Sequence, residues 1–175
     1  AFEQSVFGPY PFETVGAIVD HAPNVGYALE SQTKPNFDSA PSISTLAHEL
    51  AHQWYGDSVS LTKWQDIWLN EGFATYAEWL WSQHTGGRTP QQFFDRLYAT
   101  PASDQDLWTP PTGDPGGPAN IFGTPSYDRG AMTLQVLRNR IGDRAFFTVL
   151  RSWATQHRYG HGTTAQFIAL SERVS

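Results

Sequence analysis

The sequence predicts an α+β fold in which a small N-terminal β-sheet precedes a mostly α-helical body. Two apolar, β-branched segments lie near the start of the chain, and the periodic segments after residue 42 have the spacing of amphipathic helices. Six of the twelve prolines lie in residues 100–125, which indicates a long irregular loop between helices. At 175 residues and without cysteine, the chain is long enough for one domain whose core needs no disulfide.

The N-terminal segments are expected to form the sheet. Residues 14–20 and 27–33 are predicted as two strands that pair antiparallel, with a turn at 21–26 between them and a loop at 35–41 after them. A short helix that breaks into a turn is predicted before them, within residues 1–13.

The helical body is expected to begin with a helix that Ser42 or Ser44 caps and that ends at Gly56. Asp66 is predicted to cap a second helix, which runs to about Gln83. The other predicted elements are an extended piece at 58–64 and helices at 90–99, 127–141, 144–157 and 163–173.

Composition argues against several classes of partner. The net charge is −6 and the basic residues are scattered, so a nucleic-acid partner is not expected. No apolar run approaches the roughly 18 residues that would span a bilayer. The chain starts Ala-Phe-Glu without a Met and is interpreted as a piece of a longer protein, so the compartment is not predicted.

The segment TLAHELAHQW contains the pattern His-Glu-x-x-His, with its two histidines four residues apart. Residues at that spacing share one face of a helix, so His48 and His52 can bind a common atom. Glu49 between them can reach a water molecule on that atom, which is the arrangement of zincin metallopeptidases. A catalytic zinc has three protein ligands. Glu71, after 18 intervening residues, is the expected third ligand.

The alternative interpretation of this segment is an ordinary amphipathic helix with histidines near the surface. Leu46, Leu50 and Trp54 would form its buried face, and the tryptophans of residues 54–81 are interpreted as core. An Asn-Glu pair at the right distance on a second helical segment favours the zinc interpretation.

Two residues one and two turns beyond Glu71, Thr75 and Glu78, are interpreted as structural polar contacts, with orientation of a zinc-binding histidine as the alternative. The other four histidines lack ligand spacing and are expected at the surface.

The two motifs resemble a known family. HELAHQWYGD followed by WLNEGFATYAEWL is similar to the aminopeptidase N and leukotriene hydrolase family of gluzincin metallopeptidases, and YDRGAM at 127–132 resembles a downstream segment of that family. The resemblance implies that residues 1–175 form a thermolysin-like catalytic domain with one zinc ion. It also implies an N-terminal β domain and a C-terminal helical domain, which this sequence does not contain.

The resemblance implies a role for each motif residue. His48, His52 and Glu71 would bind Zn²⁺, and Glu49 would be the general base that takes a proton from the zinc-activated water. Tyr127 would donate a hydrogen bond to the oxyanion that forms on the substrate.

A further motif matches only in part. The family has a Gly-x-Met-Glu-Asn strand whose Glu binds the α-amine of the substrate, and the corresponding stretch is residues 26–31, GYALES. Leu29 stands for the Met and Ser31 for the Asn, and the glycine is displaced by one residue. Glu30 is the predicted amine anchor, with a solvent-facing strand residue as the alternative.

The sequence therefore predicts a zinc aminopeptidase that removes the N-terminal residue of peptides with a free amine. A gluzincin endopeptidase, an epoxide hydrolase and an inactive binding module are the alternatives. The other domains of the same chain are expected as partners. Without them, the fragment is expected to bind zinc weakly and to show little activity. The preferred residue and the oligomeric state are not predicted.

Overall fold

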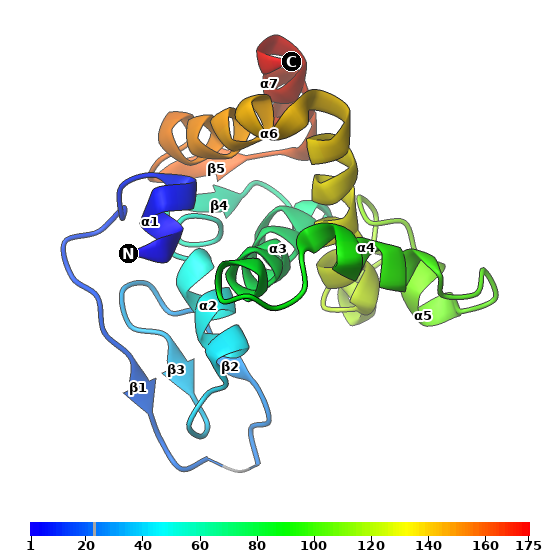
Figure 1. Ribbon diagram of the computed structural model, residues 1–175. Helices are drawn as coiled ribbons and strands as arrows, with labels where there is room; N and C mark the ends of the chain where they lie inside the picture. Colours follow the sequence, from blue (N-terminus) through cyan, green and yellow to red (C-terminus); the bar gives the residue numbers. More distant parts are fainter. Residues whose placement is uncertain (23) are drawn as a thin grey trace.

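The computed structural model describes residues 1–22 and 24–175 and has the predicted α+β fold (Figure 1). The predicted turn at 21–26 includes residue 23, which lies outside the described residues. A small sheet from the N-terminal segment lies beside a larger helical body. In chain order the elements are α1 (Phe2–Phe7), β1 (Ile18–Val19), β2 (Ala28–Leu29), β3 (Asn36–Phe37), α2 (Ile43–Ala51), β4 (Val59–Leu61), η1 (Trp64–Asp66), α3 (Trp68–His84), α4 (Pro90–Tyr98), α5 (Gln105–Trp108), η2 (Pro118–Asn120), η3 (Pro125–Arg129), α6 (Gly130–Gln156), β5 (Gly160–Gly162) and α7 (Thr164–Val174).

The N-terminal sheet has the strand order β1-β3-β2, which differs from the prediction. The predicted strands at 14–20 and 27–33 are only two residues long, and they do not pair with each other. The central strand β3 lies in the predicted loop, parallel to β1 and antiparallel to β2. Burial explains the order, because Phe37 of β3 is 3% exposed whereas Val19 of β1 is 57% exposed.

Helix α3 lies at the centre of the helical body and is buried on nearly all sides. The helix α2 packs on one side of it, and the start of α6 packs on another. A Cβ placed on Gly72 would lie 2.7 Å from the Cα of Gly130, so the absence of side chains at both positions allows the two backbones to touch. This contact brings the segment before α6 against the N-terminal half of α3.

The predicted N-cap is present in α2 and absent in α3. The Ser42 hydroxyl accepts a hydrogen bond from the Thr45 amide at 3.0 Å and caps α2, which ends at Ala51 rather than at Gly56. The prediction for Asp66 is wrong, because Ile67 occupies the N-cap of α3 and no side chain caps it. Asp66 instead accepts a hydrogen bond of 2.6 Å from Thr164 at the start of α7.

The C-terminal part contains elements that the sequence did not predict. The two predicted helices at 127–141 and 144–157 correspond to the two halves of α6, and Gly142, with a non-helical φ of 79° and ψ of 162°, breaks the helix between them as predicted. The π-helical turn η3 precedes it, and α5 and η2 lie in the predicted loop. The predicted extended piece at 58–64 contains β4, which pairs in parallel with the unpredicted β5. No helix in the described part of the chain has the length and apolarity needed to cross a bilayer.

Candidate metal centre

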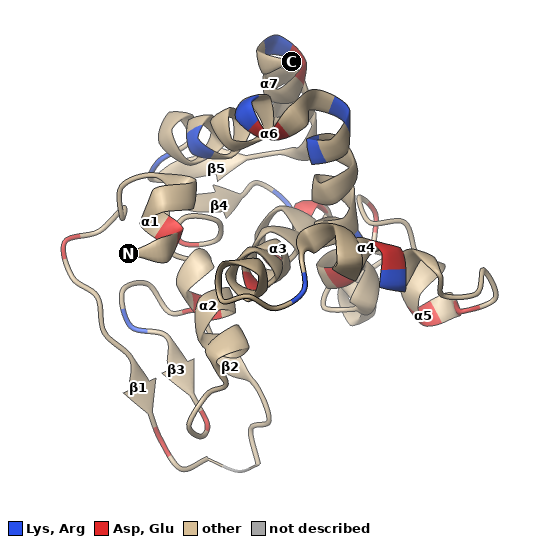
Figure 2. Cartoon of the chain, viewed as in Figure 1, with Lys and Arg blue, Asp and Glu red and all other residues tan. Residues whose placement is uncertain are grey.

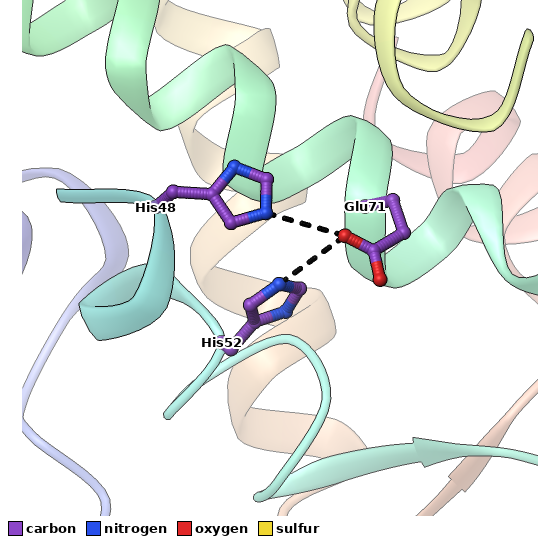
Figure 3. Close-up of side chains that lie close together, drawn as sticks. All are labelled: His48, His52 and Glu71. Atoms are coloured by element: carbon purple, nitrogen blue, oxygen red, sulfur yellow. Dashed lines mark hydrogen bonds and ion pairs between the residues drawn. The ribbon is translucent and has the colours of Figure 1, made fainter. Parts of the chain in front are cut away.

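Three potential metal ligands from two helices converge at one point (Figure 3). His48 lies on α2, and His52 lies one turn later, in the turn that ends this helix. Their Nε2 atoms are 3.2 and 3.3 Å from Oε2 of Glu71, which lies in the first turn of α3. The amphipathic pattern of α2 directs this face toward α3, and α3 is buried, so Glu71 is only 4% exposed. The two predicted histidines and the predicted carboxylate therefore face one another.

The spacing of these atoms fits a tetrahedral ion. Ligand atoms about 2.0–2.1 Å from a tetrahedral zinc lie about 3.3 Å from one another, which agrees with both distances to Glu71. The remaining imidazole nitrogens have fixed partners: Nδ1 of His48 donates to Glu78 at 2.8 Å, and Nδ1 of His52 donates to the Tyr55 carbonyl at 3.0 Å. These bonds leave both Nε2 lone pairs directed at the centre, as a zinc site requires.

The carboxylate of Glu71 remains ionised in this setting. Burial by itself raises the pKa of Glu71, but the two imidazoles in their protonated form outweigh burial through their hydrogen bonds and positive charges and lower the pKa to about 2. A metal ion at the centre would take the place of the Nε2 protons as the positive partner of this carboxylate. A buried anion between two imidazoles is a strong site for a divalent cation.

A second carboxylate pair lies next to the ligands. Glu49 is 6% exposed, and its carboxylate, that of Glu30 and a ring nitrogen of His52 all lie within 4.8 Å of one another. Burial raises the pKa of Glu49, and the charges of His52 and His48 oppose that rise. Figure 2 shows acidic positions and no basic ones on α2 and α3, whereas α4, α6 and α7 carry both acidic and basic residues.

Tyr127 approaches the centre from a third direction. It lies in the π-helical turn η3, a type of turn that is frequent at functional sites. Its ring stacks beside that of His48, with centroids 5.9 Å apart and an angle of 21° between the planes. Burial and the negative charge of Glu71 raise the pKa of Tyr127, so the hydroxyl keeps its proton and can donate it in a hydrogen bond at neutral pH.

All these groups line one cavity of about 900 Å³. The strand β2 and Glu30 after it form one wall of the cavity, and β4 and η1 form another. Phe122 and Tyr127, from the segment before α6, also line it. The structure thus brings the six predicted site residues together: Glu30, His48, Glu49, His52, Glu71 and Tyr127.

Comparison with known families agrees with this geometry. The sequence profile of the peptidase family M1 domain matches residues 13–175. The chain belongs to peptidase family M1. Aminopeptidase M1-D of Oryza sativa subsp. japonica is 32% identical over 142 residues, which cover 75% of this chain and 16% of that protein.

Solved structures of M1 proteins have the same fold. A mutant M1 zinc metallopeptidase of Deinococcus radiodurans bound to a Tyr-Ser-Ala substrate is 33% identical, with a TM-score of 0.83 over 97% of this chain and 38% of that one. Leukotriene A4 hydrolase of Saccharomyces cerevisiae, at 22% identity and a TM-score of 0.76 over 97% of this chain and 30% of that one, shows the shared fold alone. This M1 chain therefore spans only a minor part of the relatives it matches.

Of the two polar residues beyond Glu71 in this M1 domain, Glu78 has the contact with a ligand histidine that was weighed as the alternative, and Thr75 has none among the described residues. Glu78 contacts His48 and also accepts a hydrogen bond from Ser44, so it links the ligand to the start of α2. Thr75 is buried, but among the described residues no hydrogen bond joins it to His48 or His52. Of the other four histidines, His21, His84 and His161 are exposed, and His157 is half-buried against Trp153.

One residue beside the M1 motif was missed by the sequence analysis. Gln53 directly follows His52 and is fully buried, with hydrogen bonds to four separate residues. A buried glutamine must have partners, and its place between His52 and the apolar Trp54 was a signal of burial. The sequence could not identify those partners.

Proposed function

We propose that this chain is the catalytic part of a zinc-dependent aminopeptidase. The observation that carries the proposal is the convergence of His48, His52 and Glu71, with the imidazole nitrogens 3.2 and 3.3 Å from the carboxylate. Membership of family M1 supports it. The activity remains a proposal for this chain because the matched rice protein is about six times longer than the region they share.

His48, His52 and Glu71 would hold one Zn²⁺ ion. When bound, zinc supplies Lewis-acid polarisation of the scissile carbonyl and lowers the pKa of a water molecule to about 7. The outer hydrogen bonds from Glu78 and the Tyr55 carbonyl keep each imidazole in the tautomer and orientation that this role needs.

Glu49 would act as the general base. It would take a proton from the water as the water oxygen attacks the scissile carbon, and it would pass that proton to the departing amine as the C–N bond breaks. Its burial next to the ligands supports this role, because a raised pKa makes the carboxylate a better proton acceptor.

Tyr127 would stabilise the negative charge that develops on the substrate carbonyl oxygen. Its position beside His48 and its protonated hydroxyl suit a donor that acts when charge develops. From a half-buried site it can donate this hydrogen bond without competing strongly with bulk water.

Glu30 would bind the α-ammonium group of the substrate. Its carboxylate lines the cavity next to Glu49, so a free amine bound there would place the first peptide bond near the base. This wall favours an aminopeptidase over an endopeptidase, because an internal peptide offers no charge to Glu30. The complete ligand set with its base also argues against an inactive binding module.

The domain assignment is part of the same proposal. Residues 1–175 would correspond to the thermolysin-like catalytic domain, and further parts of an M1 protein would complete the walls of the cavity. Longer relatives support this view, since the chain covers 38% of the Deinococcus radiodurans protein.

Metal analysis combined with a base variant tests the function. We expect the zinc-loaded protein, in its full-length form, to contain one zinc per chain and to hydrolyse an aminoacyl arylamide. Glu49→Gln should keep the zinc and lose about 10²–10⁴-fold in kcat, the usual contribution of a general base. An N-acetylated arylamide is the control substrate and should resist cleavage. Unchanged turnover by Glu49→Gln would remove that residue from the mechanism.

A further inference from the structure

We propose that Gln53 is a positioning residue that holds Glu30 in place for the substrate amine, an inference that rests on the proposed aminopeptidase function. Gln53 lies immediately after His52 and has no exposed surface. It lies in the turn that ends α2, and its side chain contacts Tyr10, Glu30 and Thr33 of the N-terminal segment.

The amide of Gln53 uses its whole hydrogen-bonding capacity. Its nitrogen donates to the Glu30 carbonyl at 3.3 Å and to the Asp57 carboxylate at 2.7 Å. Its oxygen accepts from the Thr33 amide at 2.6 Å and from the Tyr10 hydroxyl at 3.2 Å. Two donors and two acceptor sites are all that a glutamine has, and an inverted amide would lose its bonds with the Thr33 amide and the Glu30 carbonyl, so the orientation of the side chain is determined.

Two of these bonds clamp both ends of one short segment. The Glu30 carbonyl lies at the start of residues 30–33 and the Thr33 amide lies at the end. Thr33 has a φ of 63°, a left-handed conformation that is unfavourable for a β-branched residue. The bond to its amide helps to stabilise this strained turn, which closes with a hydrogen bond from the Lys34 amide to the Ser31 carbonyl at 2.9 Å.

The clamp matters because the sheet itself holds Glu30 weakly. The strand β2 before it has two residues, and Leu29 is 49% exposed. Glu30 itself lies outside the strand and is half-buried, and the hydrogen bond from Gln53 ties its backbone to the turn that ends α2. Since α2 also carries Glu49 and His48, Gln53 sets the position of the amine-binding carboxylate relative to the base and the metal ligands.

The test compares Gln53→Met with a matched variant in the zinc-loaded, full-length protein. Methionine has a similar length but cannot make the four hydrogen bonds. We expect KM for an aminoacyl arylamide to rise about ten-fold while kcat changes less than about three-fold, because binding of the amine is lost in substrate and transition state alike. The control is Gln135→Met, another buried glutamine with three hydrogen-bond partners, remote from Glu30 in the chain. Its KM should match the wild type.

A double-mutant cycle with Glu30→Gln separates positioning from general damage. Glu30→Gln alone should raise KM for the free-amine substrate by about ten-fold or more. If Gln53 acts through Glu30, adding Gln53→Met to that background should raise KM by less than about two-fold further. Equal effects of Gln53→Met in both backgrounds would overturn the inference.

The remaining outcomes are also decisive. A wild-type KM in a folded Gln53→Met protein, beside a raised KM in Glu30→Gln, overturns the positioning role and leaves the proposed function intact. An unchanged KM in Glu30→Gln itself overturns the amine anchor and this inference with it. If Gln53→Met does not fold, Gln53→Glu decides, because it keeps both acceptor contacts and loses both donors; a wild-type KM there overturns the inference.

Discussion

The helix pair α2–α3 and the N-terminal sheet contribute to the same cavity with very different rigidity. Glu71 lies in the first turn of the buried, 17-residue helix α3 and is 4% exposed, and His52, in the turn that ends α2, is 1% exposed. Glu30 follows a two-residue strand whose Leu29 is 49% exposed. The ligands are thus held by the core, whereas the amine anchor is held by a few hydrogen bonds. Chemistry and substrate selection should therefore respond separately to mutation.

The strongest way to break this comparison is to damage the helix pair. In Gly72→Val the added Cβ would lie only 2.7 Å from the Cα of Gly130. The helices α3 and α6 would therefore have to move apart. We expect a loss of more than about 3 kcal/mol in the free energy of unfolding. Chemical denaturation measures this loss of stability. Zinc content, from elemental analysis, and turnover of the arylamide should fall together. Gly113→Val is the contrasting variant, because an added Cβ there meets no atom within 4 Å and the backbone is not left-handed.

Damage to the sheet should have the opposite pattern. Phe37 is the buried residue of β3, and Phe37→Ala is expected to cost about 3 kcal/mol. Because this loss loosens the segment that precedes α2 and not the ligands, KM for a free-amine arylamide should rise while zinc content stays near that of the wild type. Loss of zinc at wild-type KM would show that the two regions are not separable as described.

A smaller effect is expected from the outer partner of a ligand. Glu78→Gln keeps a group that can accept from Nδ1 of His48 but removes its charge. Zinc affinity should fall about 10–100-fold, the usual result of altering such a partner. Competition with a chelator measures it, and KM at saturating zinc should change little. Thr75→Ser serves as the control, since no described hydrogen bond links that residue to the histidines.

The smallest effect is expected at a site outside both regions. The hydrogen bond from Arg138 lowers the pKa of Asp143, whose side chain is 69% exposed. A lowered pKa in the folded state stabilises the protein above the ordinary Asp pKa of about 4, and this contribution is lost as pH falls through the folded-state value. Asp143→Asn should cost less than about 1 kcal/mol at pH 7, with no difference in strong acid. Urea unfolding at both pH values tests this.

The helices and the histidine pair could be predicted from local sequence patterns. The apolar periodicity of α2, α3 and α7 and the serine before α2 predicted these helices, because such signals act within one or two turns. The His-Glu-x-x-His spacing placed two side chains on one face for the same reason. These features need no information about distant parts of the chain.

Contacts between distant segments were decided by the tertiary structure. The strand β3 forms in a predicted loop because Phe37 finds a buried place, and β5 forms because β4 lies alongside it. Asp66 pairs with Thr164, which is 98 residues away, instead of capping α3. Gln53 likewise finds its four partners in three separate segments of the chain. Short strands and buried polar groups have several possible partners of similar energy, and only the packed core selects among them.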